Sequence, residues 1–365
     1  MALKVAIVGL PNVGKSTLFN ALTKTAAAQA ANYPFCTIEP NTGDVAVPEP
    51  RLNILAEIAG SKEIIPSRIT FVDIAGLVRG ASKGEGLGNQ FLANIRDCDA
   101  IAFVARCFVD DDITHVEDRI DPIADLEIIE TELMLADMES LERRRVQMEK
   151  RAKGGDKESQ LSLKLVDLAL AQLNQGKPAR TAEISKEDRK AWDMLQLLTA
   201  LPALYVSNVD ENSADKGNEL SDLVATRAAE DNAKSVVISA KIDSELAVLD
   251  EAEQLEFLET LGLAEPGLNR LIRAGFKLLG LQTYFTAGVK EVRAWTIHIG
   301  DTAPQAAGVI HTDFERGFIR AQTIAFDDFI QFKGEQAAKD AGKMRAEGKD
   351  YVVKDGDVLN FLFNV

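Results

Sequence analysis

A glycine-rich segment near the N-terminus has the spacing of a phosphate-binding loop. Residues 9–16 read Gly-Leu-Pro-Asn-Val-Gly-Lys-Ser, between a short β-branched run and a segment with helical spacing. Glycines let the backbone curl round an anion, and successive N–H groups at a helix N-terminus point at phosphate oxygens. Lys15 adds a positive charge, and Ser16 offers a hydroxyl to Mg²⁺. We therefore predict a nucleoside triphosphate site. Its predicted phosphate-side residues are Asn12, Val13, Gly14, Lys15, Ser16 and Thr17.

A second motif, Asp-Ile-Ala-Gly at residues 73–76, follows the next plausible strand. A carboxylate at a strand end beside a phosphate loop can hold the water shell of a metal ion, and the N–H of Gly76 can reach a γ-phosphate. The glycine-dense stretch 76–88 predicts a segment that rearranges when the γ-phosphate is lost. Thr37 lies at a suitable distance after the first predicted helix to give a further oxygen to Mg²⁺. We therefore predict a nucleotide switch, with Ser16, Thr37 and Asp73 at the metal.

Buried-strand patterns recur along the chain and predict the sheet that positions these motifs. The segments between them are long enough for crossover helices, which indicates an α/β fold with a doubly wound, mostly parallel sheet. The predicted strands are 3–8, 68–72, 100–107, 203–208 and 235–239, and the first predicted helix is 15–24.

The segment between the third and fourth predicted strands, 100–107 and 203–208, has a different composition. Residues 126–200 are rich in Leu, Glu, Arg, Lys and Gln with apolar residues at helical spacing, and the turn signal Gly154-Gly155 divides them. We predict an inserted antiparallel helical hairpin, or coiled coil. Its tip, residues 143–157, has seven basic and two acidic side chains. Such a patch either binds RNA or is simply a solvated helix face.

The remaining sequence predicts a third part. Short β-type runs at 294–299, 317–323 and 358–363 indicate a small mixed α/β module. We therefore expect a nucleotide-binding domain from 1–125 and 201–279, the hairpin insertion from 126–200, and a C-terminal domain from 280–365.

Composition excludes several classes of protein. The net charge of −16 disfavours a surface that is basic throughout, so any contact with nucleic acid must be local. Cys36, Cys98 and Cys107 form no Cys-x-x-Cys pair, which argues against a disulfide framework and favours a reducing cytoplasm. No apolar run approaches the length of a membrane-spanning helix, so we expect no membrane partner.

Three longer segments resemble a known family. Residues 73–91 resemble the second switch of Obg-type G proteins, and residues 32–41 and 311–321 resemble the YchF, or Obg-like ATPase, branch of that superfamily. The resemblance spans essentially the whole chain. It implies a P-loop NTPase domain, the helical hairpin and a C-terminal TGS domain with a β-grasp fold. It also implies slow hydrolysis of ATP, a cytoplasmic location and association with the large ribosomal subunit, with the hairpin tip and TGS domain as routes to RNA.

The resemblance also bears on catalysis. The glutamine that orients the attacking water in Ras-like enzymes is replaced by Leu77, and an aliphatic side chain cannot orient water. His115 matches the histidine considered catalytic in the family, so Lys15, Gly76 and His115 are the expected catalytic residues. Asn12 resembles the asparagine that coordinates K⁺ in cation-activated relatives.

The base-recognition motif departs from the guanine-reading pattern Asn-Lys-x-Asp. Here it reads Asn208-Val209-Asp210-Glu211, so the lysine is lost and the carboxylate is one methylene longer. A site that loses its guanine-reading geometry loses much of its discrimination. The family prefers ATP, with main-chain atoms at the position of Val209 reading the adenine amino group. Residues Ser239-Ala240-Lys241, after the next predicted strand, resemble the remaining base-side loop. The expected base-side residues are Asn208, Val209, Glu211, Ser239 and Ala240.

Two other functions remain open from the sequence. The chain could be a scaffold whose nucleotide is only structural, which Leu77 favours, or a GTPase with relaxed base specificity. A P-loop kinase would need an acceptor site and a lid, and no residues indicate either.

Overall fold

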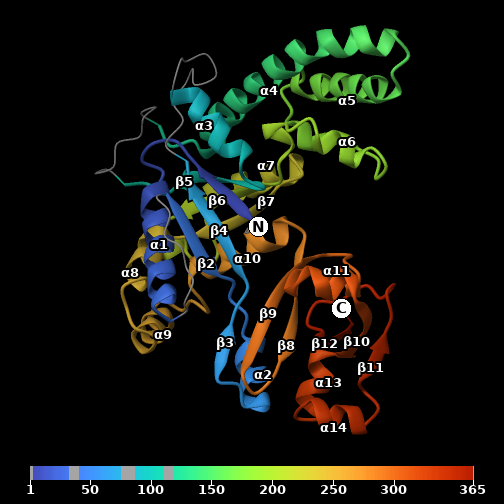
Figure 1. Cartoon of the computed structure of the whole chain (residues 1–365). Helices are drawn as coiled ribbons and strands as arrows, with labels where there is room; N and C mark the ends of the chain where they lie inside the picture. The colour runs from blue at the N-terminus through green and yellow to red at the C-terminus, as the bar shows by residue number, and fades with distance from the viewer. Residues whose placement is uncertain (1–2, 33–40, 75–86, 111–118, 365) are drawn as a thin grey trace. The chain divides into compact units, whose positions relative to one another are not determined.

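The structure is a computed structural model that describes residues 3–32, 41–74, 87–110 and 119–364 (Figure 1). The chain forms two compact units. The first is built mainly from Met1–Ala28 and Thr70–Leu278, and the second from Ala46–Ile69 and Leu279–Val365. No helix in the described part of the chain is both long and apolar enough to cross a membrane.

The first unit contains a six-stranded sheet in the order β2-β4-β1-β5-β6-β7. The strands are β1 (Lys4–Val8), β2 (Thr42–Ala46), β4 (Arg68–Asp73), β5 (Ala100–Cys107), β6 (Ala203–Val209) and β7 (Lys234–Ile238). The pairings of β1 with β4 and β5, of β5 with β6, and of β6 with β7 are parallel. Every residue of β5 and β6 is buried, because helices cover both faces of a parallel sheet. The predicted doubly wound fold is confirmed.

The edge strand β2 was not predicted. It runs antiparallel to β4, since Asp73 N–H donates to the Asn41 carbonyl (2.9 Å) and Val47 N–H donates to the Ser67 carbonyl (2.8 Å). The helix that follows β1 is also longer than expected. It is α1 (Lys15–Asn32), and its alanine-rich second half has high helix propensity. The other helices of this sheet are α3 (Leu87–Arg96), α7 (Glu219–Glu230), α8 (Ala240–Leu246), α9 (Glu251–Thr260) and α10 (Gly267–Leu278).

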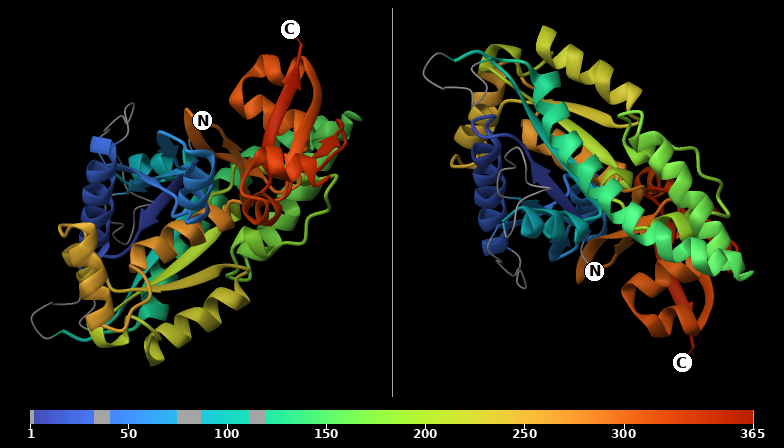
Figure 2. Two further views of the ribbon diagram at one scale, coloured as in Figure 1. Left: turned by 90° about the horizontal axis from the view of Figure 1, so that it is seen from below. Right: turned by 90° about the horizontal axis from the view of Figure 1, so that it is seen from above.

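The predicted helical hairpin is present. It consists of α4 (Pro122–Lys153) and α5 (Lys157–Leu173), which lie side by side in Figures 1 and 2. Asp121 caps α4 by accepting from Ala124 N–H (3.0 Å), and Asp156 caps α5. Leu141 and Leu165 are buried in a shared core with Trp192 from the short helix α6 (Arg189–Asp193). Two 3₁₀ turns, η1 (Ala179–Thr181) and η2 (Leu198–Ala200), lead back to β6.

The second unit has a mixed sheet in the order β11-β10-β12-β8-β9-β3. Its strands are β3 (Glu63–Ile65), β8 (Leu281–Ala287), β9 (Glu291–His298), β10 (Phe318–Ile324), β11 (Arg345–Glu347) and β12 (Val358–Phe363). A β8–β9 hairpin, the helix α11 (Ala303–Ile310) and a parallel pairing of β12 with β8 match the predicted β-grasp arrangement. The shorter helices are α12 (Thr312–Arg316), α13 (Phe326–Gln331) and α14 (Glu335–Asp340).

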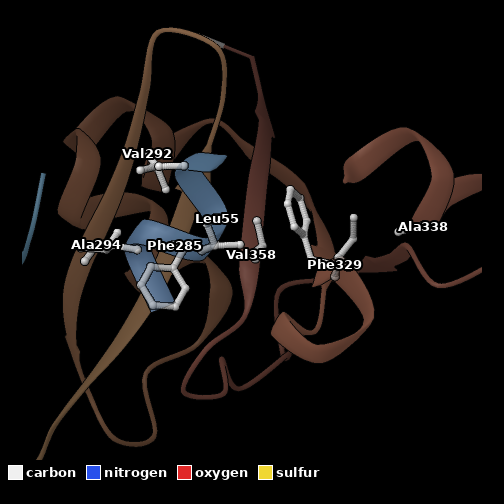
Figure 3. Packing of buried hydrophobic residues seen from close by; sticks show 10 residues of the cluster. Leu55, Phe285, Val292, Ala294, Phe329, Ala338 and Val358 are labelled. Carbon is white, nitrogen blue, oxygen red and sulfur yellow. The ribbon is translucent and has the colours of Figure 1, made fainter. Parts of the chain in front are cut away.

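The compact units divide the chain differently from the predicted domains. The segment 46–69 joins the second unit, where β3 pairs in parallel with β9 and helix α2 (Arg51–Ala59) packs on the sheet. Leu55 of α2 lies in one core with Phe285, Val292 and Val358 (Figure 3). The apolar side of α2 therefore has its partners more than two hundred residues away in sequence, which local patterns do not reveal.

Candidate functional site

The loop between β1 and α1 adopts a conformation that depends on its residue types. Asn12 has a φ of 65° and Gly14 a φ of 92°, so both lie in the left-handed region. Glycine and asparagine tolerate this region best. A Cβ atom on Gly14 would also lie 2.1 Å from the side-chain nitrogen of Asn208. Only glycine fits this position.

The two phosphate-side motifs meet at adjacent strand ends. Ile7 of β1 is paired with Asp73 at the end of β4, which brings the Asp73 carboxylate to the loop. There Lys15, only 8% exposed, forms an ion pair with Asp73. A buried ammonium group needs such a partner because burial alone disfavours its charge.

Asn208 connects the phosphate side of the site to the base side. It lies near the end of β6 and is 4% exposed. Its side-chain nitrogen donates to the Val13 carbonyl (3.0 Å), and its side-chain oxygen accepts from Ala240 N–H (2.9 Å). One buried amide thus holds the phosphate loop, β6 and the start of α8 in fixed register.

A pocket of about 720 Å³ lies over these elements, within the size range of small-ligand sites. The predicted residues that line it are Asn12, Gly14, Lys15, Ser16, Thr17, Asn208, Val209, Glu211 and Ala240. Val13 and Ser239 are buried behind this lining, and the Ser239 hydroxyl has no hydrogen-bond partner among the described residues. Lys241, from the expected base-side loop 239–241, also lines the pocket. The lining residues that were not among the predicted contacts are Leu10, Pro11, Phe108, Val109, Asp110, Asp210, Ser244 and Glu245.

The loop after β5 forms one wall of this pocket and is held by Arg106. This arginine is 1% exposed; its Nε donates to the Phe108 carbonyl (3.2 Å) and its Nη2 to the Asp110 carbonyl (3.1 Å). Its guanidinium carbon also lies 4.6 Å from the centre of the Phe108 ring. Val109, which lines the pocket, is 72% exposed. The sequence analysis did not single out this wall; the feature that could have indicated it is an arginine inside an otherwise apolar strand.

At the base side, Glu211 and Lys241 form an ion pair across the pocket mouth. The hydrogen bond from Lys241 lowers the pKa of Glu211, and the same bond raises the pKa of Lys241. The neighbouring Asp210 is engaged elsewhere, since it accepts from Asn212 N–H (3.0 Å) and from the Ser213 hydroxyl (3.0 Å).

Three predicted site residues, Thr37, Gly76 and His115, lie outside the described residues. The residues that are described fit a magnesium ion, because the Ser16 hydroxyl and the Asp73 carboxylate are hard oxygen donors at the same loop. Among the described residues no group of three or more His, Cys, Asp or Glu could hold a metal ion. Mg²⁺ is usually bound by one or two carboxylates together with substrate phosphates, and the Asp73 carboxylate could serve in this way.

The basic tip of the hairpin is less uniform than its sequence suggests. Arg144 donates to the Leu195 carbonyl (2.9 Å), and its partial burial lowers the pKa of its guanidinium. Arg145 pairs with Asp167 (2.7 Å) and Glu149 (3.2 Å). The side chains of these two arginines are therefore engaged by neighbouring segments of the protein. The basic side chains left exposed are Arg143, Lys150, Arg151, Lys153 and Lys157.

Comparisons with known proteins agree with this geometry. A family model described as 50S ribosome-binding GTPase matches residues 4–135, and the YchF-GTPase_C model, described as a protein of unknown function (DUF933), matches residues 281–364. The chain is 59% identical over 365 residues to the ribosome-binding ATPase YchF of Escherichia coli O157:H7, covering 100% of both. It is 53% identical over 367 residues to the protein of that name from Bacillus subtilis strain 168, again covering 100% of both. The solved structure of the Schizosaccharomyces pombe YchF GTPase is 37% identical, with a TM-score of 0.87 over 99% of this chain and 97% of that one.

Proposed function

The chain belongs to the YchF family, and from this premise we propose that it is a Mg²⁺-dependent nucleotide switch that hydrolyses ATP and associates with the ribosome. The observation that carries the proposal is the ion pair between Asp73 and Lys15, which lines the 720 Å³ pocket. It joins the two motifs that must act together on a bound triphosphate. A ribosomal role would place the protein in the cytoplasm.

Each residue of the phosphate side has a distinct task in this scheme. Backbone N–H groups of the loop and the Lys15 ammonium bind the phosphates. Ser16 and Thr37 would hold Mg²⁺ directly, with Asp73 behind them. The metal, when bound, neutralises charge that develops on the phosphate oxygens. Gly76 senses the γ-phosphate, and His115 supports the attack of water. Asn12 is the proposed ligand for K⁺.

Preference for ATP over GTP is part of the proposal. The position of the guanine-covering lysine is taken by Val209, which is 3% exposed and lines the pocket. Glu211 is paired with Lys241, so its carboxylate is engaged before a base arrives. Both features weaken the recognition of guanine.

The decisive experiment measures phosphate release from ATP and from GTP, with Mg²⁺ and K⁺, with and without ribosomes. We expect slow turnover of ATP, slower turnover of GTP, and none above background for Lys15→Ala. His115→Ala should keep nucleotide binding and lower the hydrolysis rate. Absence of phosphate release from the unaltered protein under every condition would favour the scaffold function instead.

The ribosome contact is proposed to run through the exposed basic residues of the hairpin tip and through the C-terminal domain. Charge reversal at Lys150, Arg151 and Lys153 should weaken co-sedimentation with the large subunit and reduce its salt dependence. Arg144 and Arg145 are less suitable targets because their side chains are already engaged by other residues of the protein. Unchanged co-sedimentation of the triple variant would rule out this route.

A further inference from the structure

We propose that Lys241 determines the base specificity of the pocket, because it holds the Glu211 carboxylate away from the edge at which a guanine would be read. The inference rests on the proposed function, since it requires a purine nucleoside triphosphate in the 720 Å³ pocket. It concerns a residue outside the four-residue base motif, on a different element of the fold.

The first support is the position of the pair. Glu211 begins a short 3₁₀ turn directly after β6, and Lys241 lies in the first turn of α8. The two elements are fixed relative to each other by Asn208, which accepts from the Ala240 amide (2.9 Å). Both side chains line the same pocket, and no other ion pair of either is found in the described part of the chain.

The second support is the charge around the pair. The carboxylates that line the pocket are Asp110, Asp210, Glu211 and Glu245. Among the described residues, the basic side chains that line it are Lys15, at the phosphate loop, and Lys241. Glu245 and Asp110 also raise the pKa of Lys241, after the larger contribution of Glu211. Lys241 is therefore the cation that balances the acidic base end of the pocket.

The two purines differ in what they offer to this pair. Guanine presents N1–H and a 2-amino group, which are donors that a carboxylate accepts. Adenine presents a lone pair at N1 and has no 2-amino group. GTP must therefore compete with Lys241 for Glu211, whereas ATP binds with the pair intact. The pair also neutralises a carboxylate that would repel the adenine lone pair. It therefore disfavours GTP and favours ATP.

The expected effect is moderate because the pair is open to solvent. The side chain of Lys241 is 67% exposed and that of Glu211 is 40% exposed. Exposed ion pairs of this kind change affinities by up to about fivefold, and release of Glu211 to guanine adds to the shift. We expect Lys241→Ala to lower the preference for ATP over GTP by about threefold to tenfold.

The test is a titration of the full-length protein with non-hydrolysable ATP and GTP analogues in the presence of Mg²⁺. Lys241→Ala should bind the GTP analogue more tightly and the ATP analogue equally or less tightly. Lys241→Arg, which keeps the charge, should retain the original preference. The matched control is Lys216→Ala, which removes an exposed lysine of the following loop that does not line the pocket.

A double-mutant cycle isolates the pair from other effects of the charge. In a Glu211→Gln background the pair cannot form, so Lys241→Ala should no longer change the ratio of the two dissociation constants. An equal change for both nucleotides, or no change in the ratio, would overturn the inference. The proposed function fails separately, if the unaltered protein binds neither analogue or prefers GTP.

Discussion

Two glutamates form ion pairs near opposite ends of strand β6, and the two pairs differ in burial and in the number of their partners. Near the start of the strand, Glu130 pairs with Arg180, and their side chains are only 2% and 6% exposed. The Tyr205 hydroxyl lies 2.6 Å from Glu130 and receives a hydrogen bond from Arg180 (3.0 Å). Beyond the end of the strand, Glu211 pairs with Lys241 in the open mouth of the pocket.

The two pairs differ in burial, and this difference distinguishes a pair that stabilises the fold from a pair that can take part in ligand binding. The Glu130 pair belongs to a network with Arg227 and Asp231 that joins α4, η1, β6 and α7 at the base of the hairpin. Removing one member leaves the other buried and uncompensated. The Glu211 pair is solvated, contributes little to stability and can be exchanged for a ligand contact. The same residue type thus anchors the hairpin at one end of the strand and selects the ligand at the other.

The largest expected effect is at the buried pair. Glu130→Ala leaves the Arg180 guanidinium buried without its carboxylate, so we expect the free energy of unfolding to fall by about 3–5 kcal/mol. Nucleotide affinity measured well below the melting temperature should not change. The control is Glu127→Ala on the same helix. Its carboxylate is 57% exposed and lies 3.4 Å from Arg227, so less than about 1 kcal/mol is expected. Equal losses from the two variants in urea denaturation would contradict the comparison.

A buried carboxylate near the nucleotide pocket extends the comparison of the two ion pairs. If burial decides the effect on stability, this carboxylate should affect the free energy of unfolding although it lies near the pocket. Asp243 of α8 is 1% exposed and accepts from Leu268 N–H (3.0 Å) at the start of α10. Desolvation raises its pKa from 3.8 to about 6. The folded state therefore favours the neutral acid. Asp243 therefore makes its full contribution to the free energy of unfolding below about pH 4, and that contribution is lost as the pH rises through about 6.

Asp243→Asn should remove this part of the pH profile. We expect the free energy of unfolding of the unaltered protein, relative to the variant, to fall by up to about 3 kcal/mol between pH 4 and pH 7. Urea denaturation at several pH values measures it, with the exposed Asp222→Asn as control. Parallel profiles for Asp243→Asn and the unaltered protein would show that Asp243 does not titrate in this window.

Asn208, which is buried beside the phosphate loop, is an uncharged polar group with which the charged groups can be compared. Asn208→Ala leaves the Val13 carbonyl and the Ala240 amide without their partner and releases the register of the loop. We expect the dissociation constants of ATP and GTP analogues to rise together by about tenfold. This uniform loss contrasts with the selective shift expected from Lys241→Ala. The control is Asn212→Ala in the following turn, and a selective loss of one nucleotide would contradict the assignment.

The sequence predicted the strands and the phosphate loop well because both depend on local patterns. The predicted strand 100–107 agrees with β5, and 203–208 agrees with β6 to within one residue, since buried parallel strands are continuous apolar runs. Lys15, Asp73 and Asn208 follow from their positions at parallel strand ends, which meet at one edge of the sheet.

Other parts depend on partners far away in sequence. The strand β3 has three residues, and its pairing with β9 joins residues 63–65 to 291–293. The pairing of Lys241 with Glu211 likewise depends on how α8 is placed against β6. At the hairpin tip, the sequence shows how many basic residues there are but not which of them are engaged. That depends on how α5 and the segment after α6 pack against α4.

The smallest expected effect concerns two adjacent arginines at the hairpin tip, Arg143 and Arg144. Within the described part of the chain, only one of them is hydrogen-bonded through its side chain to other residues, so they allow a second comparison of engaged and exposed charge. Arg144 donates to the Leu195 and Ser140 carbonyls, at 2.9 and 3.3 Å, whereas Arg143 is exposed. Arg144→Ala should lower the free energy of unfolding by about 1 kcal/mol, since it removes hydrogen bonds from a charged group. Arg143→Ala should leave stability unchanged and, if the tip contacts RNA, weaken co-sedimentation with the large ribosomal subunit. Thermal melts and sedimentation of both variants measure the two effects. A loss of stability in Arg143→Ala, or none in Arg144→Ala, would show that the engaged arginine has been wrongly assigned.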